Sequence, residues 1–218
     1  MPPVIGVLAL QGAFAAHAES LRRCGASTSE VRTPGDLAAV DALVMPGGES
    51  STMSQLLESS GLFTAVAARI SEGMAVLGTC AGMILLASEV LDGRSDQRSF
   101  SALDISVRRN AFGRQIDSFE ASIDTPEGPF HGVFIRAPRI ERVGPGVDIL
   151  GSLDGEPVLV RRGNVLAASF HPELAGDDRL HGYFVSVVSP GDVPDGHHRA
   201  GAGPAGAAVD TRERKREG

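Results

Sequence analysis

Short runs of hydrophobic residues alternate with amphipathic stretches over the first half of the chain. The near-continuous apolar runs at 4–10, 41–45 and 75–79 are typical of strands that are buried on both faces. The stretches that follow them predict a helix over 13–24, a helix capped by Ser50 or Ser51, and a helix over 81–89. This alternation of strands and helices predicts an α/β domain with a parallel sheet at its centre.

The pattern changes after about Leu103, where short apolar segments are separated by Gly, Pro and Asp turns. Strands are expected over 103–109, 116–123, 130–136, 147–152, 157–161 and 164–170, with a closing helix over 178–188. The α/β domain should therefore carry an added antiparallel β portion. Residues 190–218 are rich in Gly, Ala and Pro and have Val193 and Val209 as their large apolar residues. A domain over 1–189 followed by a disordered tail over 190–218 is the expected organisation.

Composition narrows the class of protein. The chain has 42% hydrophobic and 22% charged residues, which is ordinary for a globular protein, and its net charge of −7 disfavours binding to nucleic acid. The apolar runs are too short to span a bilayer, and no basic segment precedes the first of them, so a soluble cytoplasmic protein is expected. The chain has only two cysteines and no spacing of Cys and His residues that is typical of zinc sites, so we expect neither a disulfide framework nor a bound metal. His197 and His198 are interpreted as solvated side chains of the tail.

The sharpest chemical signal is the segment 77–83 (LGTCAGM), in which a buried strand ends at Cys80 and a helix begins. The pattern Gly-x-nucleophile-x-Gly is that of a nucleophile elbow with sulfur in place of oxygen. Glycines remove side chains where the strand and the helix approach each other. The backbone N–H of Ala81 is then placed to bind an oxyanion. A buried structural cysteine is the alternative interpretation of Cys80.

A candidate base and acid occur near the end of the domain, in the segment 168–173 (ASFHPE). In an extended segment, residues two apart point to the same side, so His171 and Glu173 are expected to share a face. The carboxylate can then orient the imidazole as the third member of a Cys-His-acid set. Competing candidate bases are His17, His131 and His181.

A glycine pair follows the second buried strand, in the segment 45–51 (MPGGESS). Paired glycines allow backbone N–H groups to point into a site, so Gly48 is a second candidate for an oxyanion hole. A phosphate-binding loop is the competing interpretation, but the segment lacks the glycine and lysine spacing of such loops.

The segments 46–52 (PGGESST), 78–82 (GTCAG) and 170–173 (FHPE) together resemble the class I, or triad, glutamine amidotransferases. Four more segments resemble the glutaminase subunits of pyridoxal 5′-phosphate synthase, the PdxT family: 6–12 (GVLALQG), 107–115 (VRRNAFGRQ), 117–120 (DSFE) and 133–138 (VFIRAP). The resemblance extends from about Val4 to Val188 and implies a flavodoxin-like α/β fold with a mainly parallel central sheet.

The resemblance also implies roles for individual residues. Cys80 corresponds to the nucleophile, His171 to the base and Glu173 to the acid that orients it. The residues that match the family's substrate-binding positions are Gly48, Glu49, Ser50, Arg109, Ile135 and Arg136. Gln11 matches a glutamine near the oxyanion hole and the partner interface. No metal or organic cofactor is implied.

The implied reaction is hydrolysis of L-glutamine to L-glutamate and ammonia. The implied partner is PdxS, a (β/α)₈-barrel synthase subunit that joins the ammonia with a pentose phosphate and a triose phosphate to make pyridoxal 5′-phosphate. Two alternatives remain open from the sequence. One is a glutaminase subunit of another synthase, such as imidazole glycerol phosphate synthase, and the other is a non-catalytic binding module on the same fold.

Overall fold

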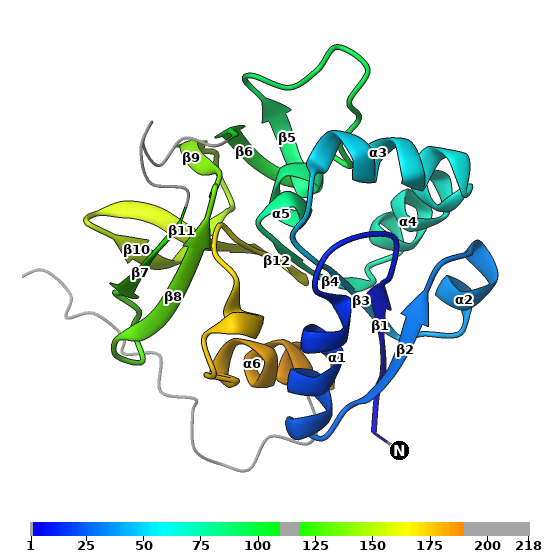
Figure 1. Cartoon of the computed structure of the whole chain (residues 1–218), viewed down its shortest axis with the longest axis horizontal. Coiled ribbons are helices and arrows are strands. Elements are labelled where there is room, and N and C mark those ends of the chain that lie inside the picture. The colour runs from blue at the N-terminus through cyan, green and yellow to red at the C-terminus, as the bar shows by residue number, and fades with distance from the viewer. Residues whose placement is uncertain (1, 110–117, 190–218) are drawn as a thin grey trace, which may run out of the picture.

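The carboxyl ends of three neighbouring strands meet at one edge of a central sheet. A computed structural model of the protein describes residues 2–109 and 118–189 (Figure 1). The expected tail over 190–218, and residues 116 and 117 of one expected strand, lie outside the described residues. The seven-stranded sheet has the order β10-β11-β12-β4-β3-β1-β2. Its strands are β1 (Val4–Leu8), β2 (Ser27–Val31), β3 (Ala42–Met45), β4 (Ala75–Thr79), β10 (Asp148–Leu153), β11 (Glu156–Arg162) and β12 (Val165–Ala168).

Strands β2, β1, β3, β4 and β12 run parallel, while β11 and β10 extend the sheet in antiparallel pairing. Met45 at the end of β3 pairs with Gly78, and Ala168 at the end of β12 pairs with Thr79. The segments that follow β3, β4 and β12 therefore leave the sheet side by side. These are the three segments in which the sequence places Gly48, Cys80 and His171.

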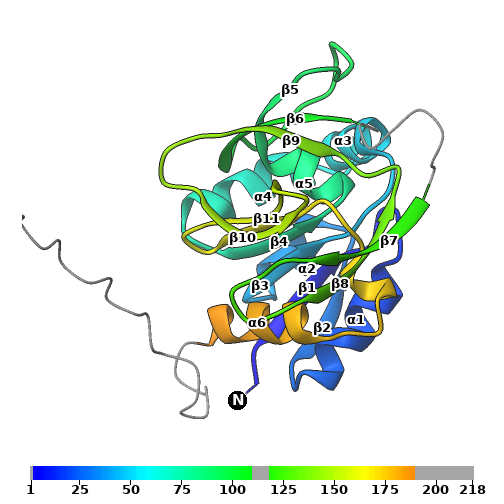
Figure 2. The same cartoon turned by 90° about the vertical axis from the view of Figure 1, so that its left-hand side faces the viewer.

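Helices cover both faces of this sheet. They are α1 (Phe14–Arg23), α2 (Pro34–Ala38), α3 (Ser50–Ser59), α4 (Leu62–Ser71), α5 (Ala81–Leu86) and α6 (Arg179–Val188), together with the 3₁₀ turn η1 (Pro172–Leu174). Figures 1 and 2 show α1 and α6 on one face and α3, α4 and α5 on the other. Buried residues of β3 alternate between two cores: Leu43 and Met45 pack toward α3 to α5, while Ala42 and Val44 pack toward α1 and α6.

Two smaller sheets make up the added β portion. One has the order β5-β6-β9, from β5 (Ala87–Val90), β6 (Leu103–Arg108) and β9 (Arg139–Val143), and the other is the hairpin of β7 (Ser118–Ile123) and β8 (Phe130–Ile135). The pairs β6–β9 and β7–β8 are antiparallel, whereas β5–β6 is parallel. The predicted α/β architecture with an added antiparallel portion is thus confirmed.

Two local predictions are wrong. The expected helix over 81–89 ends at Leu86, because Ala87 adopts an extended backbone (φ −64°, ψ 150°) and pairs with Leu103 as the start of β5. Neither serine caps α3; the N-cap is Glu49, whose carboxylate accepts the N–H groups of Ser51 and Thr52. A carboxylate near the first turn satisfies two free N–H groups at once and suits the positive end of the helix.

The strands β2 and β9 and the helices α2 and α4 have no counterpart in the predicted elements. Strand β2 (STSEV) lies at the edge of the sheet and has one buried residue, Val31, so it lacks the apolar run that marks the central strands. Within the described parts of the chain, no helix is long and apolar enough to cross a membrane.

The helix that follows Cys80 packs against the sheet at a distance that leaves no room for a side chain. A Cβ atom at Gly82 would lie 2.1 Å from the backbone oxygen of Met45, and one at Gly78 would lie 2.7 Å from the backbone oxygen of Gly82. The predicted role of these two glycines, to permit close approach of strand and helix, is confirmed.

We expect Gly82→Ala to lower the free energy of unfolding by about 1–3 kcal/mol, because backbone rather than a flexible side chain must move to make room. The matched control is Gly35→Ala in α2, where the nearest atom, Thr33 Oγ1, is 3.7 Å from the new Cβ. Urea unfolding followed by circular dichroism should show the loss in Gly82→Ala and no loss in Gly35→Ala. Equal midpoints for both variants would contradict the close-approach argument.

Candidate functional site

A cavity of about 390 Å³ opens where the segments after β3, β4 and β12 meet. The residues that line it are Gly12, Ala13, Gly47, Gly48, Glu49, Ser50, Cys80, Ile84, Arg109, Ile135, Arg136, His171, Glu173 and Leu174. Every predicted catalytic and substrate-binding residue is among them. Ala81, predicted to supply an oxyanion N–H, follows Cys80 as the first residue of α5.

Cys80 occupies a strained turn between β4 and α5. Its backbone angles (φ 50°, ψ −104°) are unfavourable for a residue with a side chain. Such strain is found mainly where the surrounding structure enforces it at functional sites. The thiol is nearly buried, with 6% of the residue exposed, and its Sγ lies 3.9 Å from the backbone oxygen of Ile135. The elbow predicted from the sequence is therefore present in the backbone.

His171 and Glu173 contact each other, although not through the predicted extended segment. Pro172 begins the 3₁₀ turn η1, which brings the two side chains together on the inside of a turn. The prediction of an extended segment is wrong, because the chain bends directly after His171. The predicted pairing of the two side chains is confirmed, since His171 Nδ1 lies 2.8 Å from Glu173 Oε1. The Glu173 side chain is fully buried, and the His171 side chain is 12% exposed.

The electrostatics of this pair favour an imidazolium. Burial by itself lowers the pKa of His171, but contacts with the Cys80 sulfur and the Glu173 carboxylate outweigh it and raise that pKa to about 10. For Glu173 the directions are reversed. Burial raises the pKa of this carboxyl group, but the hydrogen bond to His171 and the nearby His17 outweigh burial and lower the pKa. A protonated imidazole beside a cysteine stabilises the thiolate, which is the nucleophilic form.

The glycine loop packs directly on the histidine. A Cβ atom at Gly47 would lie 2.4 Å from His171 Cε1, and one at Gly48 would lie 2.9 Å from Gln11 Oε1. Gln11 Oε1 also accepts the N–H of Glu49 at 2.9 Å, which fixes the peptide that follows Gly48. Gly47 was not predicted as a site residue; its only signal in the sequence is its place beside Gly48.

Arg109 enters the cavity from the end of β6 and is held by polar side chains. Its guanidinium donates to Ser51 Oγ at 2.9 Å, to Gln97 Oε1 at 3.2 Å and to Glu49 Oε1 at 3.3 Å. Burial raises the pKa of Glu49, and hydrogen bonds from Thr52 and Ser51 outweigh this and lower it to about 2. Ser51 and Gln97 were not predicted here, since nothing in the local sequence links them to an arginine so distant along the chain.

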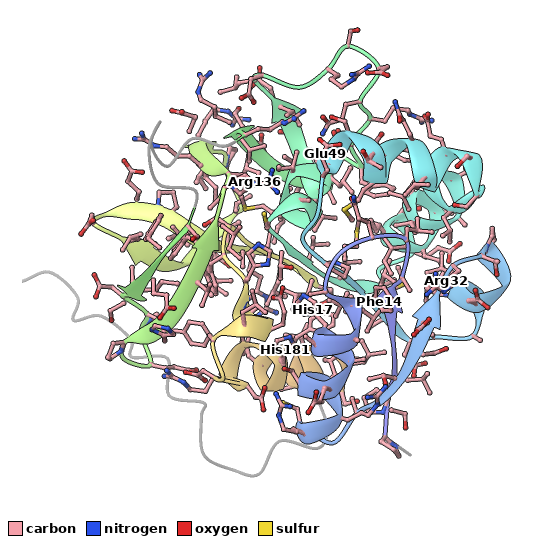
Figure 3. All side chains as sticks on the ribbon, viewed as in Figure 1. Phe14, His17, Arg32, Glu49, Arg136 and His181 are labelled. Carbon is pink, nitrogen blue, oxygen red and sulfur yellow. The ribbon has the colours of Figure 1, made fainter. Side chains whose placement is uncertain are left out.

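Ile135 and Arg136 reach the cavity from the end of β8. Arg136 has a positive φ of 43°, so a second strained residue faces the same cavity as Cys80. Figure 3 shows Arg136 and Glu49 as side chains that come from separate parts of the fold, the β8 end and the start of α3. The elbow pattern predicts the turn at Cys80, whereas no local pattern in the sequence predicts the one at Arg136.

The three competing candidate bases lie outside the cavity lining. His131 is half exposed and pairs with Glu120 at 3.0 Å. His17 and His181 are fully buried behind Glu173. Among the described residues, no group of three or more His, Cys, Asp and Glu side chains is arranged to hold a metal ion.

Comparison with known proteins agrees with the predicted family. The chain is 56% identical over 194 residues to a protein of Salinispora arenicola named "Pyridoxal 5′-phosphate synthase subunit PdxT", covering 85% of this chain and 96% of the relative. It is 52% identical over 193 residues to the protein of the same name from Mycobacteroides abscessus, covering 88% and 100%.

A crystal structure described as a glutamine amidotransferase superimposes with a TM-score of 0.80 at 49% identity, covering 84% of this chain and 98% of that one. The structure of PurLQS from Thermotoga maritima matches with a TM-score of 0.61 at 16% identity over 86% of this chain and 95% of the other, which supports the fold alone. The SNO glutamine amidotransferase family matches residues 7–189, and the chain belongs to that family.

Proposed function

We propose that this protein is the glutaminase subunit of a pyridoxal 5′-phosphate synthase, which hydrolyses L-glutamine and passes the ammonia to a PdxS-type subunit. The observation that carries the proposal is the single cavity that brings Cys80 together with the hydrogen-bonded pair of His171 and Glu173. The family match and the PdxT relatives at more than half identity support the same assignment.

In the first step, the Cys80 thiolate attacks the side-chain amide carbon of glutamine. The oxygen of that amide becomes an oxyanion, which the N–H groups of Gly48 and Ala81 stabilise in this proposal. The His171 imidazolium transfers its proton to the departing nitrogen, so ammonia leaves and a glutamyl thioester remains on Cys80.

In the second step, neutral His171 takes a proton from water, and the resulting hydroxide attacks the thioester carbon. The carbon–sulfur bond breaks, glutamate leaves, and the Cys80 thiolate and His171 imidazolium are restored. Glu173 keeps its negative charge throughout and supports the positive charge of the imidazolium. Neither step uses a metal or an organic cofactor.

Glutamine is zwitterionic at its α-carbon and therefore needs both a cation and an anion in the site. Arg109 and Arg136 line the cavity as cations, and Glu49, held as a carboxylate directly after the glycine pair, is an anion beside Arg109. The backbone of Ile135 and the Gly48–Ser50 segment complete this proposed binding site. Arg109 is the preferred contact for the α-carboxylate because its position is fixed by three polar neighbours.

The choice of partner follows from the relatives rather than from the fold. The relatives at 52% and 56% identity bear the PdxT name, whereas the structure at 16% identity shares the fold alone. This favours a PdxS-type partner over imidazole glycerol phosphate synthase. A cytoplasmic location belongs to the same proposal; the two free cysteines, Cys24 and Cys80, suit a reducing compartment.

We expect Cys80→Ala to abolish glutamine hydrolysis, with a loss of several orders of magnitude in kcat, because the variant lacks the proposed nucleophile. Product formation by the complex with PdxS should survive when ammonium replaces glutamine. Cys24→Ala, which changes the other cysteine, is the matched control and should keep normal activity. Near-normal glutaminase turnover in Cys80→Ala would refute the mechanism.

Arg109→Met should raise KM for glutamine roughly tenfold to hundredfold, since a hydrogen bond to a charged group contributes about 1.5–3 kcal/mol. The neighbouring Arg108→Met is the control: Arg108 lies on the surface and pairs with Glu141 at 3.0 Å. Steady-state kinetics of both variants with PdxS present decide the point. If the two variants have the same KM, Arg109 does not contact the substrate.

We further propose that residues 1–189 form the glutaminase domain and that 190–218 lie outside it, as the family match over 7–189 suggests. A chain truncated after Ser189 should keep its melting temperature and its activity with PdxS, because α6 ends at Val188 and closes the core. A fall of several degrees on truncation would show that the tail contributes to the fold.

A further inference from the structure

Two histidines are buried directly behind the acid of the site. His17 belongs to α1 and His181 to α6, neither has exposed surface, and Figure 3 shows them next to each other between the two helices. His17 Nδ1 lies 2.9 Å from His181 Nε2. On its other side, His17 Nε2 lies 3.2 Å from Glu173 Oε2 and 3.3 Å from Thr79 Oγ1. A continuous polar path thus connects the helix pair with Glu173.

Burial favours the neutral form of both rings. Burial lowers the pKa of His17 to about 4, although the charge of Glu173 opposes the shift. Burial also lowers the pKa of His181 to about 4. The negative charges of Glu173 and Asp178 oppose this shift, and the positive charge of Arg23 adds to it. Each neutral imidazole carries one N–H and one bare nitrogen. The pair can therefore have either of two polarities.

The surroundings select one polarity. If His17 donated to His181, its bare Nε2 would face the Glu173 carboxylate, and His181 would bury an N–H at Nδ1, an atom that has no hydrogen-bond partner. The reverse arrangement places the His17 N–H on Nε2, toward Thr79 and Glu173, and leaves only a bare nitrogen at His181 Nδ1. An unpaired acceptor costs less than a buried unpaired donor combined with repulsion between a lone pair and an anion.

We infer that His17 is a positioning residue for Glu173. His181 donates a hydrogen bond to His17 Nδ1, and the resulting Nε2–H of His17 faces Oε2, the carboxylate oxygen of Glu173 that does not contact His171. This inference deepens the proposed glutaminase function and rests on it. Oε2 is buried and makes no well-aligned hydrogen bond, so an N–H dipole at 3.2 Å contributes to offsetting its charge there. The other carboxylate oxygen, Oε1, can then accept the hydrogen bond from His171 Nδ1.

The consequence for catalysis is indirect. Glu173 supports the His171 imidazolium only while it is ionised and oriented, and the imidazolium in turn pairs with the Cys80 thiolate. Removing the N–H dipole behind Oε2 should therefore lower the pKa of His171 and decrease kcat, while the glutamine-binding side of the cavity is unaffected. At metal sites, loss of the groups that orient a histidine or carboxylate ligand costs about 10- to 100-fold, and we expect a loss of similar size here.

The test compares three variants in the full chain. His17→Phe keeps a ring of similar size and removes both nitrogens, and His17→Gln keeps a side-chain N–H that reaches toward Glu173. Leu21→Ala removes buried volume from the same helix and controls for loss of stability. Glutamine hydrolysis with PdxS is measured for each, and His171 is titrated by NMR of ring-labelled histidine, with its signal assigned from His171→Asn.

We expect His17→Phe to lower kcat about 10- to 100-fold with KM little changed, and to lower the pKa of His171. His17→Gln should recover most of both effects, and Leu21→Ala should show neither. An unchanged His171 titration in His17→Phe, or a His17→Gln variant no better than His17→Phe, would overturn the inference.

Two further measurements keep the test decisive. If His17→Phe does not fold, His181→Leu and His181→Gln replace it, because the glutamine N–H can still donate to His17 Nδ1 and the leucine cannot. Loss with leucine and recovery with glutamine is the expected result, and equal behaviour contradicts the inference. If the wild-type protein does not hydrolyse glutamine with PdxS, the proposed function fails, while the NMR titration, which needs no substrate, still decides whether His17 positions Glu173.

Discussion

The site depends on one unfavourable backbone turn, at Cys80. A residue with a side chain pays about 1–3 kcal/mol for such angles, and the turn persists only because its surroundings allow no other path. Buried strand β4 holds one side of the turn, and α5, pressed onto the backbone of β3 at Gly82, holds the other. The thiol consequently projects from the sheet edge where the segments after β3 and β12 also emerge.

Parallel pairing of β3, β4 and β12 then determines which groups meet the thiol. Their carboxyl ends lie in register, so the glycine loop and the His171 turn converge on Cys80 without long excursions of the chain. The resulting contacts place charged groups in a largely buried environment. There an ion pair is favourable only when further hydrogen bonds or charges compensate both of its members. Cys80, His171, Glu173 and His17 form such a sequence of partners from the cavity into the core.

The added strands have a different task from that of the central sheet. The end of β6 supplies Arg109 and the end of β8 supplies Ile135 and Arg136, whereas the segments after the parallel strands β4 and β12 supply the proposed nucleophile, base and acid. Arg109 also ties β6 to the start of α3 through Glu49 and Ser51. The groups proposed to recognise the substrate thus come from the added strands, and they face the proposed catalytic residues across one cavity.

The amino-acid sequence by itself determined the α/β class, the central strands, the elbow around Cys80 and the predicted catalytic and substrate-binding residues that meet in the cavity. The class, the strands and the elbow follow from apolar runs and glycine spacing, whereas the substrate-binding residues follow from the resemblance to the glutamine amidotransferases. Tertiary structure alone decided the end of α5 at Leu86, the turn that joins His171 to Glu173, and the neighbours of Arg109 and His17. These depend on pairing and burial between segments up to 164 residues apart, as for His17 and His181, which no local pattern encodes.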